Sequence, residues 1–90
     1  MKLTEIITDQ SPDAIMNKLP EGLDSIRHAS IIFKCIEGEA RARVGDSRDE
    51  MCIQLEEEGI VRFSYKNSDE DYNVYYLTKM GIELLTGKSK

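Results

Sequence analysis

The spacing of apolar residues along this chain changes from a helical period to a strand-like period and back. In residues 25–37, apolar positions three and four residues apart predict an amphipathic helix whose buried stripe holds Ile26, Ala29, Ile32, Phe33 and Ile36. A shorter helix is predicted between Ser11 and Leu19. Ser11 is a favoured N-cap, and Pro20 disfavours helical geometry in the residue before it. The buried side of this helix would hold Ala14, Ile15, Met16 and Leu19.

A third helix is predicted over Ser47–Glu58. Ser47 and Glu50 have the spacing of a capping box, in which a hydroxyl and a carboxylate each satisfy a backbone N–H at the helix start. Gly59 suits the left-handed position that commonly follows a helix. We expect one side of this helix to be buried and the other exposed: Met51, Cys52 and Leu55 on the buried side, Ile53 near its edge, and Arg48, Asp49, Gln54 and Glu57 on the exposed side.

Two later stretches, Ile60–Lys66 and Tyr72–Leu77, are rich in β-branched and aromatic residues. The polar residues 67–71 between them predict a loop, so the two stretches should pair as a β-hairpin. Thr78 can cap a closing helix that ends before Gly87.

A basic segment precedes the third helix. We predict a short helix over Glu39–Val44, joined by a turn at Gly45 and Asp46 to the helix at Ser47–Glu58. Two helices joined by a tight turn that contains glycine are the layout of a helix-turn-helix.

Two segments of the second half carry a resemblance to a known family. Leu55-Glu56-Glu57-Glu58-Gly59-Ile60-Val61 resembles the end of the recognition helix in winged-helix transcription regulators of the MarR and PadR type. Tyr75-Tyr76-Leu77-Thr78-Lys79-Met80-Gly81 resembles the end of the return strand of their wing. The resemblance implies an α+β winged helix: a three-helix core with the helix-turn-helix, a two- or three-stranded antiparallel wing and a C-terminal helix. We expect a single domain over residues 1–90, with residues 1–10 as an N-terminal arm or an added strand.

The resemblance also implies a small transcriptional regulator that binds double-stranded DNA as a homodimer. The residues expected to contact DNA are Arg41 and Arg43 at phosphates, Ser47, Arg48 and Gln54 near base edges, and Arg62 and Lys66 along the stem of the wing. A continuous positive strip through Arg41, Arg43, Arg48 and Lys66 would favour this hypothesis, and a broken strip would favour the second hypothesis, which follows.

The charge of the chain favours a second hypothesis. The net charge is −5 and the isoelectric point is about 4.8, whereas proteins that bind nucleic acid usually present a basic surface. Residues 34–48 hold four basic side chains against three acidic ones, a weak local excess. The predicted wing tip carries Asp69, Glu70 and Asp71, where the related regulators commonly present a basic residue. The alternative is therefore an acidic winged-helix module that binds a basic protein partner instead of DNA.

The predicted hairpin has one strongly aromatic face. Alternation groups Val61, Phe63 and Tyr65 with Tyr72, Val74 and Tyr76, while Ile60, Ser64, Tyr75 and Leu77 share the other face with Arg62, Lys66 and Asn73. The resemblance places Tyr75 and Leu77 inward, so the aromatic face needs cover. Cover could come from residues 3–7, from the helix at residues 12–19, or from a second chain. The expected dimer or partner interface comprises Phe63, Tyr65, Tyr72, Val74 and Tyr76.

No catalytic motif is apparent. Cys35 and Cys52 lie in apolar helical stretches and predict buried core residues, with a redox pair as the alternative. His28 has no evident nucleophile or substrate pocket, and the sequence contains no phosphate-binding loop or set of clustered metal ligands. We expect a protein that is not an enzyme and has no catalytic residues, cofactor or metal. A bilayer-spanning run and a long secretory segment are also missing, which predicts a cytoplasmic protein without a membrane partner.

Overall fold

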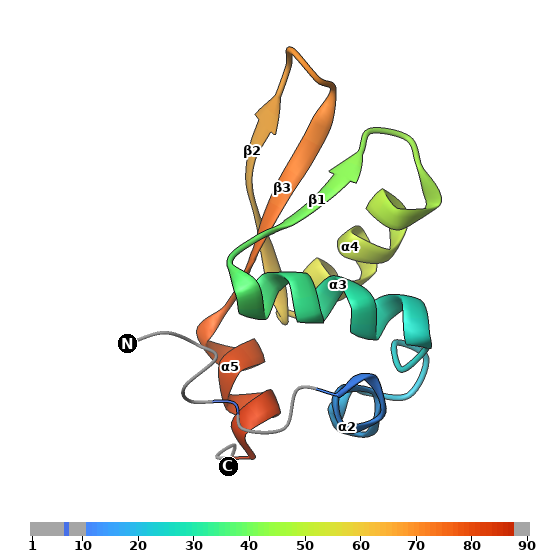
Figure 1. Ribbon diagram of the computed structural model, residues 1–90, viewed down its shortest axis with the longest axis vertical. Coiled ribbons are helices and arrows are strands. Elements are labelled where there is room, and N and C mark those ends of the chain that lie inside the picture. Colours follow the sequence, from blue (N-terminus) through green and yellow to red (C-terminus); the bar gives the residue numbers. More distant parts are fainter. Residues whose placement is uncertain (1–6, 8–10, 88–90) are drawn as a thin grey trace.

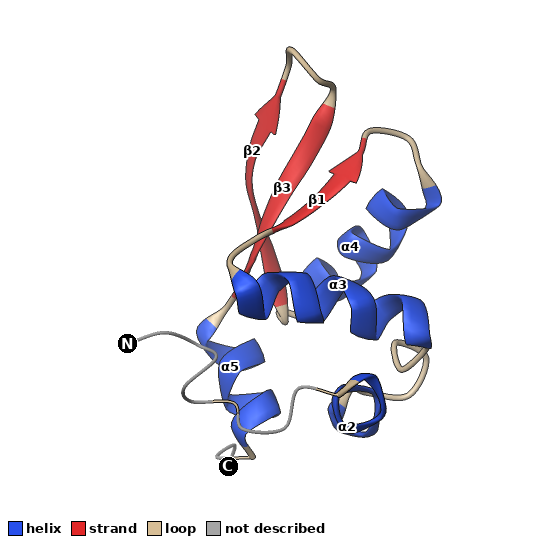
Figure 2. Cartoon of the chain, viewed as in Figure 1, coloured by secondary structure: helices blue, strands red, loops and turns tan. Residues whose placement is uncertain are grey.

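The computed structural model describes Ile7 and residues 11–87, and within them the fold is α+β (Figures 1 and 2). Four helices and a three-stranded antiparallel sheet follow one another as α2 (Pro12–Lys18), α3 (Ile26–Glu37), β1 (Ala40–Arg43), α4 (Ser47–Glu57), β2 (Val61–Asn67), β3 (Tyr72–Leu77) and α5 (Lys79–Thr86). The strand order is β1-β3-β2. The hairpin of β2 and β3 forms one end of the molecule and α2 and α5 form the other, with α3 between them. No helix in the described part of the chain is long and apolar enough to cross a membrane.

The predicted N-caps Ser11 and Thr78 are confirmed, and Ser25 is a third hydroxyl N-cap. The hydroxyl of Ser11 accepts a hydrogen bond from the N–H of Ala14, and that of Ser25 accepts one from the N–H of His28. Thr78 does the same for Gly81 at the start of α5. Each hydroxyl satisfies an N–H that has no partner inside the helix, so the polar residues flanking the apolar runs set where these helices begin.

The predicted capping box at the start of α4 is wrong. Asp46 is the N-cap, and its carboxylate accepts a hydrogen bond from the N–H of Ser47. The carbonyl of Asp46 accepts further bonds from Asp49 and Glu50. An acid at this position has the additional advantage of facing the positive end of the helix dipole.

The predicted short helix at Glu39–Val44 is wrong, because residues 40–43 form the edge strand β1. Ala40 and Ala42 are buried, whereas Arg41 and Arg43 are exposed, which is the period of two expected for a half-buried strand. β1 pairs with β3, and this pairing satisfies backbone groups that a short isolated helix would leave open. The predicted helix-turn-helix is therefore absent from this segment, where a strand and a turn precede α4.

The core lies between the helices and one face of the sheet. It combines apolar side chains of α2, α3, α4 and α5 with the two buried alanines of β1 and with Ile7. Both cysteines are reduced and buried there, as predicted. α2 packs on α3 and α5, so the helix proposed as cover for the aromatic sheet face lies elsewhere. The other proposed cover, residues 3–7, falls outside the described residues except for Ile7, as does the expected arm or strand at residues 1–10.

The hairpin is confirmed, but its alternation is interrupted. The pairing partners are Phe63 with Tyr75 and then Tyr65 with Val74, so Ser64 is an extra residue in β2. Such a bulge reverses the faces of the residues that follow it. Phe63 therefore shares the helix-covered face with Tyr75, against which its ring packs edge to face with centroids 5.9 Å apart. Assigning Phe63 and Val61 to the outer aromatic face was wrong, and Val61 is buried.

The turn after α4 packs closely against the start of α5. Gly59 has the left-handed backbone expected of it, with φ of 81°. The backbone N–H and the hydroxyl of Thr78 each donate to the carbonyl oxygen of Ile60 at 3.0 Å. A Cβ on Gly81 would overlap this same oxygen, so only glycine fits there.

Candidate nucleic-acid interface

The face of the sheet opposite α3 and α4 is lined by arginine and tyrosine side chains. Because cross-strand partners share a face, the register assigns the following residues to this open face: Arg41 and Arg43 of β1, Tyr72, Val74 and Tyr76 of β3, and Arg62, Tyr65 and Asn67 of β2. Val74 at the centre is fully buried beneath its neighbours, and Tyr65 retains 46% of its exposure. Of the five residues expected at a dimer or partner interface, Tyr65, Tyr72, Val74 and Tyr76 are together here, and Phe63 is not.

The side chains of the open face hold one another in position. The guanidinium of Arg41 lies 5.4 Å from the centre of the Tyr72 ring, a distance suited to a cation–π contact. Its Nε donates to Glu39 at 2.9 Å, and this hydrogen bond raises the pKa of Arg41. Glu39 also accepts from the hydroxyl of Tyr76, while Asn67 donates to the hydroxyl of Tyr72. These contacts reduce the number of rotamers available to the rings and to Arg41 before any ligand arrives.

The charge of the open face is opposite to that of the whole chain. Arg41, Arg43 and Arg62 are exposed, and Glu39 is the acid that faces them. Three arginines against one glutamate give this surface an excess of positive charge, although the chain carries a net charge of −5. Tyr65 lies among these groups, where desolvation, followed by the charge of Glu39, raises the pKa of its hydroxyl.

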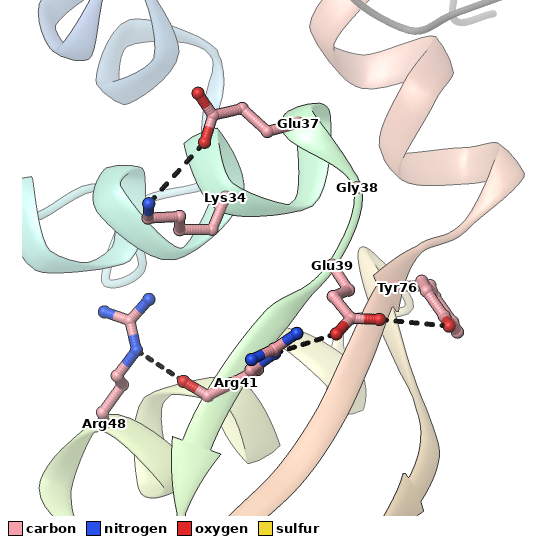
Figure 3. Close-up of a pocket in the computed structure, with 7 residues that line it drawn as sticks. All are labelled: Lys34, Glu37, Gly38, Glu39, Arg41, Arg48 and Tyr76. Carbon is pink, nitrogen blue, oxygen red and sulfur yellow. Dashed lines mark hydrogen bonds and ion pairs between the residues drawn. The ribbon is translucent and has the colours of Figure 1, made fainter.

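A groove of about 700 Å³ leads from the edge of β1 toward the open face (Figure 3). It is lined by Lys34, Glu37 and Gly38 at the end of α3, by Glu39, Arg41 and Tyr76 of the sheet region, and by Arg48 of α4. The Nε of Arg48 donates to the backbone carbonyl of Arg41 at 2.9 Å. Lys34 is paired with Glu37 at 3.7 Å, whereas no acid within the described residues pairs with Arg48.

Arg48 also borders a second, smaller hollow between α3 and the start of α4. This hollow of about 380 Å³ is lined by Arg27, Ser30 and Ile31 of α3 and by Asp46, Ser47, Arg48 and Met51. Arg48 lines both hollows, and two further predicted contact residues line one each: Arg41 the groove and Ser47 the smaller hollow.

Two residues of α4 differ from their predicted roles. Gln54 is exposed, but its side-chain oxygen accepts a hydrogen bond from Nε2 of His28 at 3.0 Å. Nδ1 of His28 is bonded to the hydroxyl of Ser25, so the imidazole connects the start of α3 to the second half of α4. Gln54 is therefore exposed and also joins α4 to α3 through this hydrogen bond.

Asp49 was expected to be exposed, and this was wrong. It is only 7% exposed, and Oδ1 accepts from the hydroxyl of Tyr75 at 2.8 Å and from the amide of Asn73 at 3.1 Å. Burial and the bond to Asp49 raise the pKa of Tyr75. The carboxylate is turned to the sheet, where two donors satisfy it. The exposed charges of α4 are instead dominated by Glu50, Glu56, Glu57 and Glu58.

The positive strip is broken, and this outcome favours the acidic interaction module over the expected mode of DNA binding. Lys66 pairs with Asn73, whose side chain reaches α4, so Lys66 lies on the helix-covered face of the sheet. It also forms an ion pair with Asp71 at 3.7 Å. Arg41, Arg43 and Arg62 lie on the opposite face, and Arg48 lies at the β1 edge between the two.

The sequence contained one signal that would have led to this surface. Ala-Arg-Ala-Arg alternates with a period of two, and taken as a strand it places both arginines on one face. The pairing of Glu39 with Arg41 and the bulge at Ser64 have no comparable signal. Within the described residues, no three histidine, cysteine or acidic side chains are grouped as a metal site would require. Comparison of the chain with models of protein families, with curated proteins and with solved structures found no match.

Proposed function

We propose that this protein is a small DNA-binding regulator of the winged-helix type whose contact surface is centred on β1. The observation that carries the proposal is the convergence of Arg41, Arg43 and Arg48 at one edge of the sheet, with Arg62 across the open face. Arginine suits phosphate because its planar guanidinium presents several donors at once. The order α3, β1, α4, hairpin and the sheet order β1-β3-β2 are compatible with a winged helix.

The proposal differs from the expected binding mode in which element faces DNA. A strand occupies the place of the first helix of the helix-turn-helix, and α4 carries three exposed glutamates, with a fourth, Glu58, at its C-cap. Carboxylates near phosphate are repelled, and this repulsion is strongest at short range. DNA would therefore approach β1 and the groove lined by Arg41 and Arg48, with the exposed glutamates of α4 turned away.

A polarisation titration with labelled DNA at about 50 mM salt tests the proposal, since low salt favours phosphate contacts. The double variant Arg41→Ala/Arg43→Ala should weaken binding at least roughly tenfold and reduce the salt dependence, because each lost phosphate contact lowers the slope. Lys66→Ala is the matched control: it removes one positive charge from the other face of the sheet and should change the affinity much less. Absence of binding to duplex and single-stranded DNA alike would overturn the proposal.

A second candidate function has its own observation. Glu50, Glu56, Glu57 and Glu58 of α4 are exposed, as are the three acids at residues 69–71 of the wing tip. These surfaces would suit a basic protein partner, which acidic side chains attract over several ångströms. The test is a pull-down from nuclease-treated extract, with wild type compared to Glu57→Lys/Glu58→Lys. Recovery of a basic protein by the wild type alone would favour this function, and recovery of nucleic acid without protein would count against it.

A further inference from the structure

We infer that the open face binds single-stranded nucleic acid, with Tyr65, Tyr72 and Tyr76 stacking on unpaired bases and Arg41, Arg43 and Arg62 contacting phosphates. This inference rests on the proposed function and narrows it, since it names unpaired bases as the ligand. The residues concerned belong to three adjacent strands, and their placement follows from the register.

The first argument is the arrangement of the rings. Tyr72 and Tyr76 lie four residues apart on the central strand, which corresponds to roughly 13 Å at about 3.3 Å per residue. Tyr65 lies on the neighbouring strand beside Val74, between those two levels. The three rings thus form a triangle over the buried Val74, and successive bases of an extended strand can lie across it. Stacking of this kind tolerates any sequence because every base has an aromatic face.

The second argument is the position of the charges around the rings. Arg41 and Arg43 come from the β1 edge and Arg62 from the β2 edge, so the cations flank the tyrosines on both sides. A backbone that crosses the face meets positive charge as it enters and as it leaves, while its bases lie over the rings. In a duplex the bases are already stacked on one another, and proteins reach only their edges in the grooves. Tyrosines gathered on one face of a sheet are therefore suited to unpaired bases.

The third argument concerns a second copy of the chain, the other occupant that the tyrosines suggest. Two open faces brought together would oppose Arg41, Arg43 and Arg62 of one copy to the same residues of the other. Among the described residues, the acid bonded to the side chains of this face is Glu39, which already accepts from Arg41 and Tyr76. Like charges opposed across an interface disfavour association. A polyanion neutralises the positive charge of this surface, whereas a second copy would bring further positive charge to it.

The test compares the affinities of a labelled oligothymidylate and a duplex of the same length at about 50 mM salt. We expect tighter binding of the single strand. Tyr65→Ala should weaken it roughly 5- to 100-fold, the range for loss of one stacked base. Phe63→Ala is the matched control: Phe63 lies on the same strand, is 42% exposed compared with 46% for Tyr65, and faces the other way, so it should change the affinity less than twofold. The chain has four tyrosines and no tryptophan, so stacking should also quench the tyrosine emission directly.

The possible outcomes separate the two proposals. If neither DNA form binds, the proposed function fails and this inference fails with it. If duplex binds as tightly as the single strand, or if Tyr65→Ala acts no more strongly than Phe63→Ala, the inference is overturned and the proposed function stands. Sedimentation could also show that the protein is a dimer. If Tyr65→Ala dissociates this dimer and oligothymidylate does not, the inference is overturned, because the open face would then hold a second copy.

Discussion

The carboxylate of Asp49 accepts a hydrogen bond from the hydroxyl of Tyr75 at 2.8 Å, which joins the first turn of α4 to the central strand of the sheet. The same oxygen accepts from Asn73. α4 is thus fixed to β3 by polar bonds in addition to its apolar contacts through Cys52 and Leu55. Fully satisfied groups of this kind favour one arrangement of the packed elements.

Replacing Asp49 should therefore destabilise the fold. Asp49→Ala leaves the hydroxyl of Tyr75 and the amide of Asn73 without an acceptor, and we expect a loss of about 2–3 kcal/mol in the free energy of unfolding. Urea denaturation measures it. Glu50→Ala, at the neighbouring exposed position, is the control and should stay within about 0.5 kcal/mol of wild type. Equal effects of the two changes would contradict this account of Asp49.

Gly81→Ala should also destabilise the protein, although alanine is the better helix former. Propensity alone predicts a gain of about 1 kcal/mol, whereas overlap of the new Cβ with the carbonyl oxygen of Ile60 predicts a loss of about 1–3 kcal/mol. The sign of the change in thermal midpoint separates the two effects. Lys79→Ala in the same helix is exposed and should be nearly neutral. A higher midpoint for Gly81→Ala would show that the turn at residues 59–60 can move away from α5.

Stability should decline at alkaline pH because of the buried thiols. Burial raises the pKa of the Cys35 and Cys52 thiols from the ordinary value of 9.0 to about 12. Below about pH 9 both states keep their protons; above it the unfolded chain ionises first, so stability falls as pH rises, by up to about 1.4 kcal/mol per pH unit for each thiol. Urea midpoints measured across this range check the slope. Cys35→Ala should be less stable near neutral pH but have a shallower decline, and an unchanged slope would contradict the assignment.

Gln54→Ala should weaken the fold more than loss of an ordinary surface residue does. The bond from His28 to Gln54 joins α3 to α4, and removing its acceptor should cost about 1 kcal/mol. Glu57→Ala, which is exposed one turn later on α4, is the control and should be close to neutral. If both variants unfold at the same urea concentration, the bond contributes nothing measurable.

The parts of the fold that sequence predicted correctly depend on local chemistry. Ser11 and Thr78 cap helices because a hydroxyl can reach a nearby N–H, and the pattern of Tyr72–Leu77 gives the central strand its correct limits. The cap of α4 was a local error, since Asp46 takes the place expected for Ser47. Two larger errors arose where distant contacts decide. Residues 40–43 form a strand because β3 offers them a partner, and Asp49 is buried because Asn73 and Tyr75 lie opposite it.

The candidate site was predicted only in part, because its assembly depends on contacts between residues that are distant in sequence. All six arginine and tyrosine residues of this surface were named beforehand, but as two separate sets: Arg41, Arg43 and Arg62 as DNA contacts implied by the resemblance, and Tyr65, Tyr72 and Tyr76 as a partner interface from alternation. The strand register unites them on the open face. Because of the bulge at Ser64, Tyr65 lies on the open face whereas Phe63 lies on the helix-covered face. Alternation alone does not predict such a shift of one residue in the register.

Both outer strands of the sheet carry features that block the addition of a further strand. Along β1 the carbonyl of Arg41 is occupied by Arg48, and the carbonyl of Arg43 accepts from the N–H of Asp46. Along β2 the exposed Arg62 and Lys66 and the irregularity at Ser64 make a regular ladder unfavourable. The chain can therefore present a three-stranded sheet at high concentration without its borders templating fibrils.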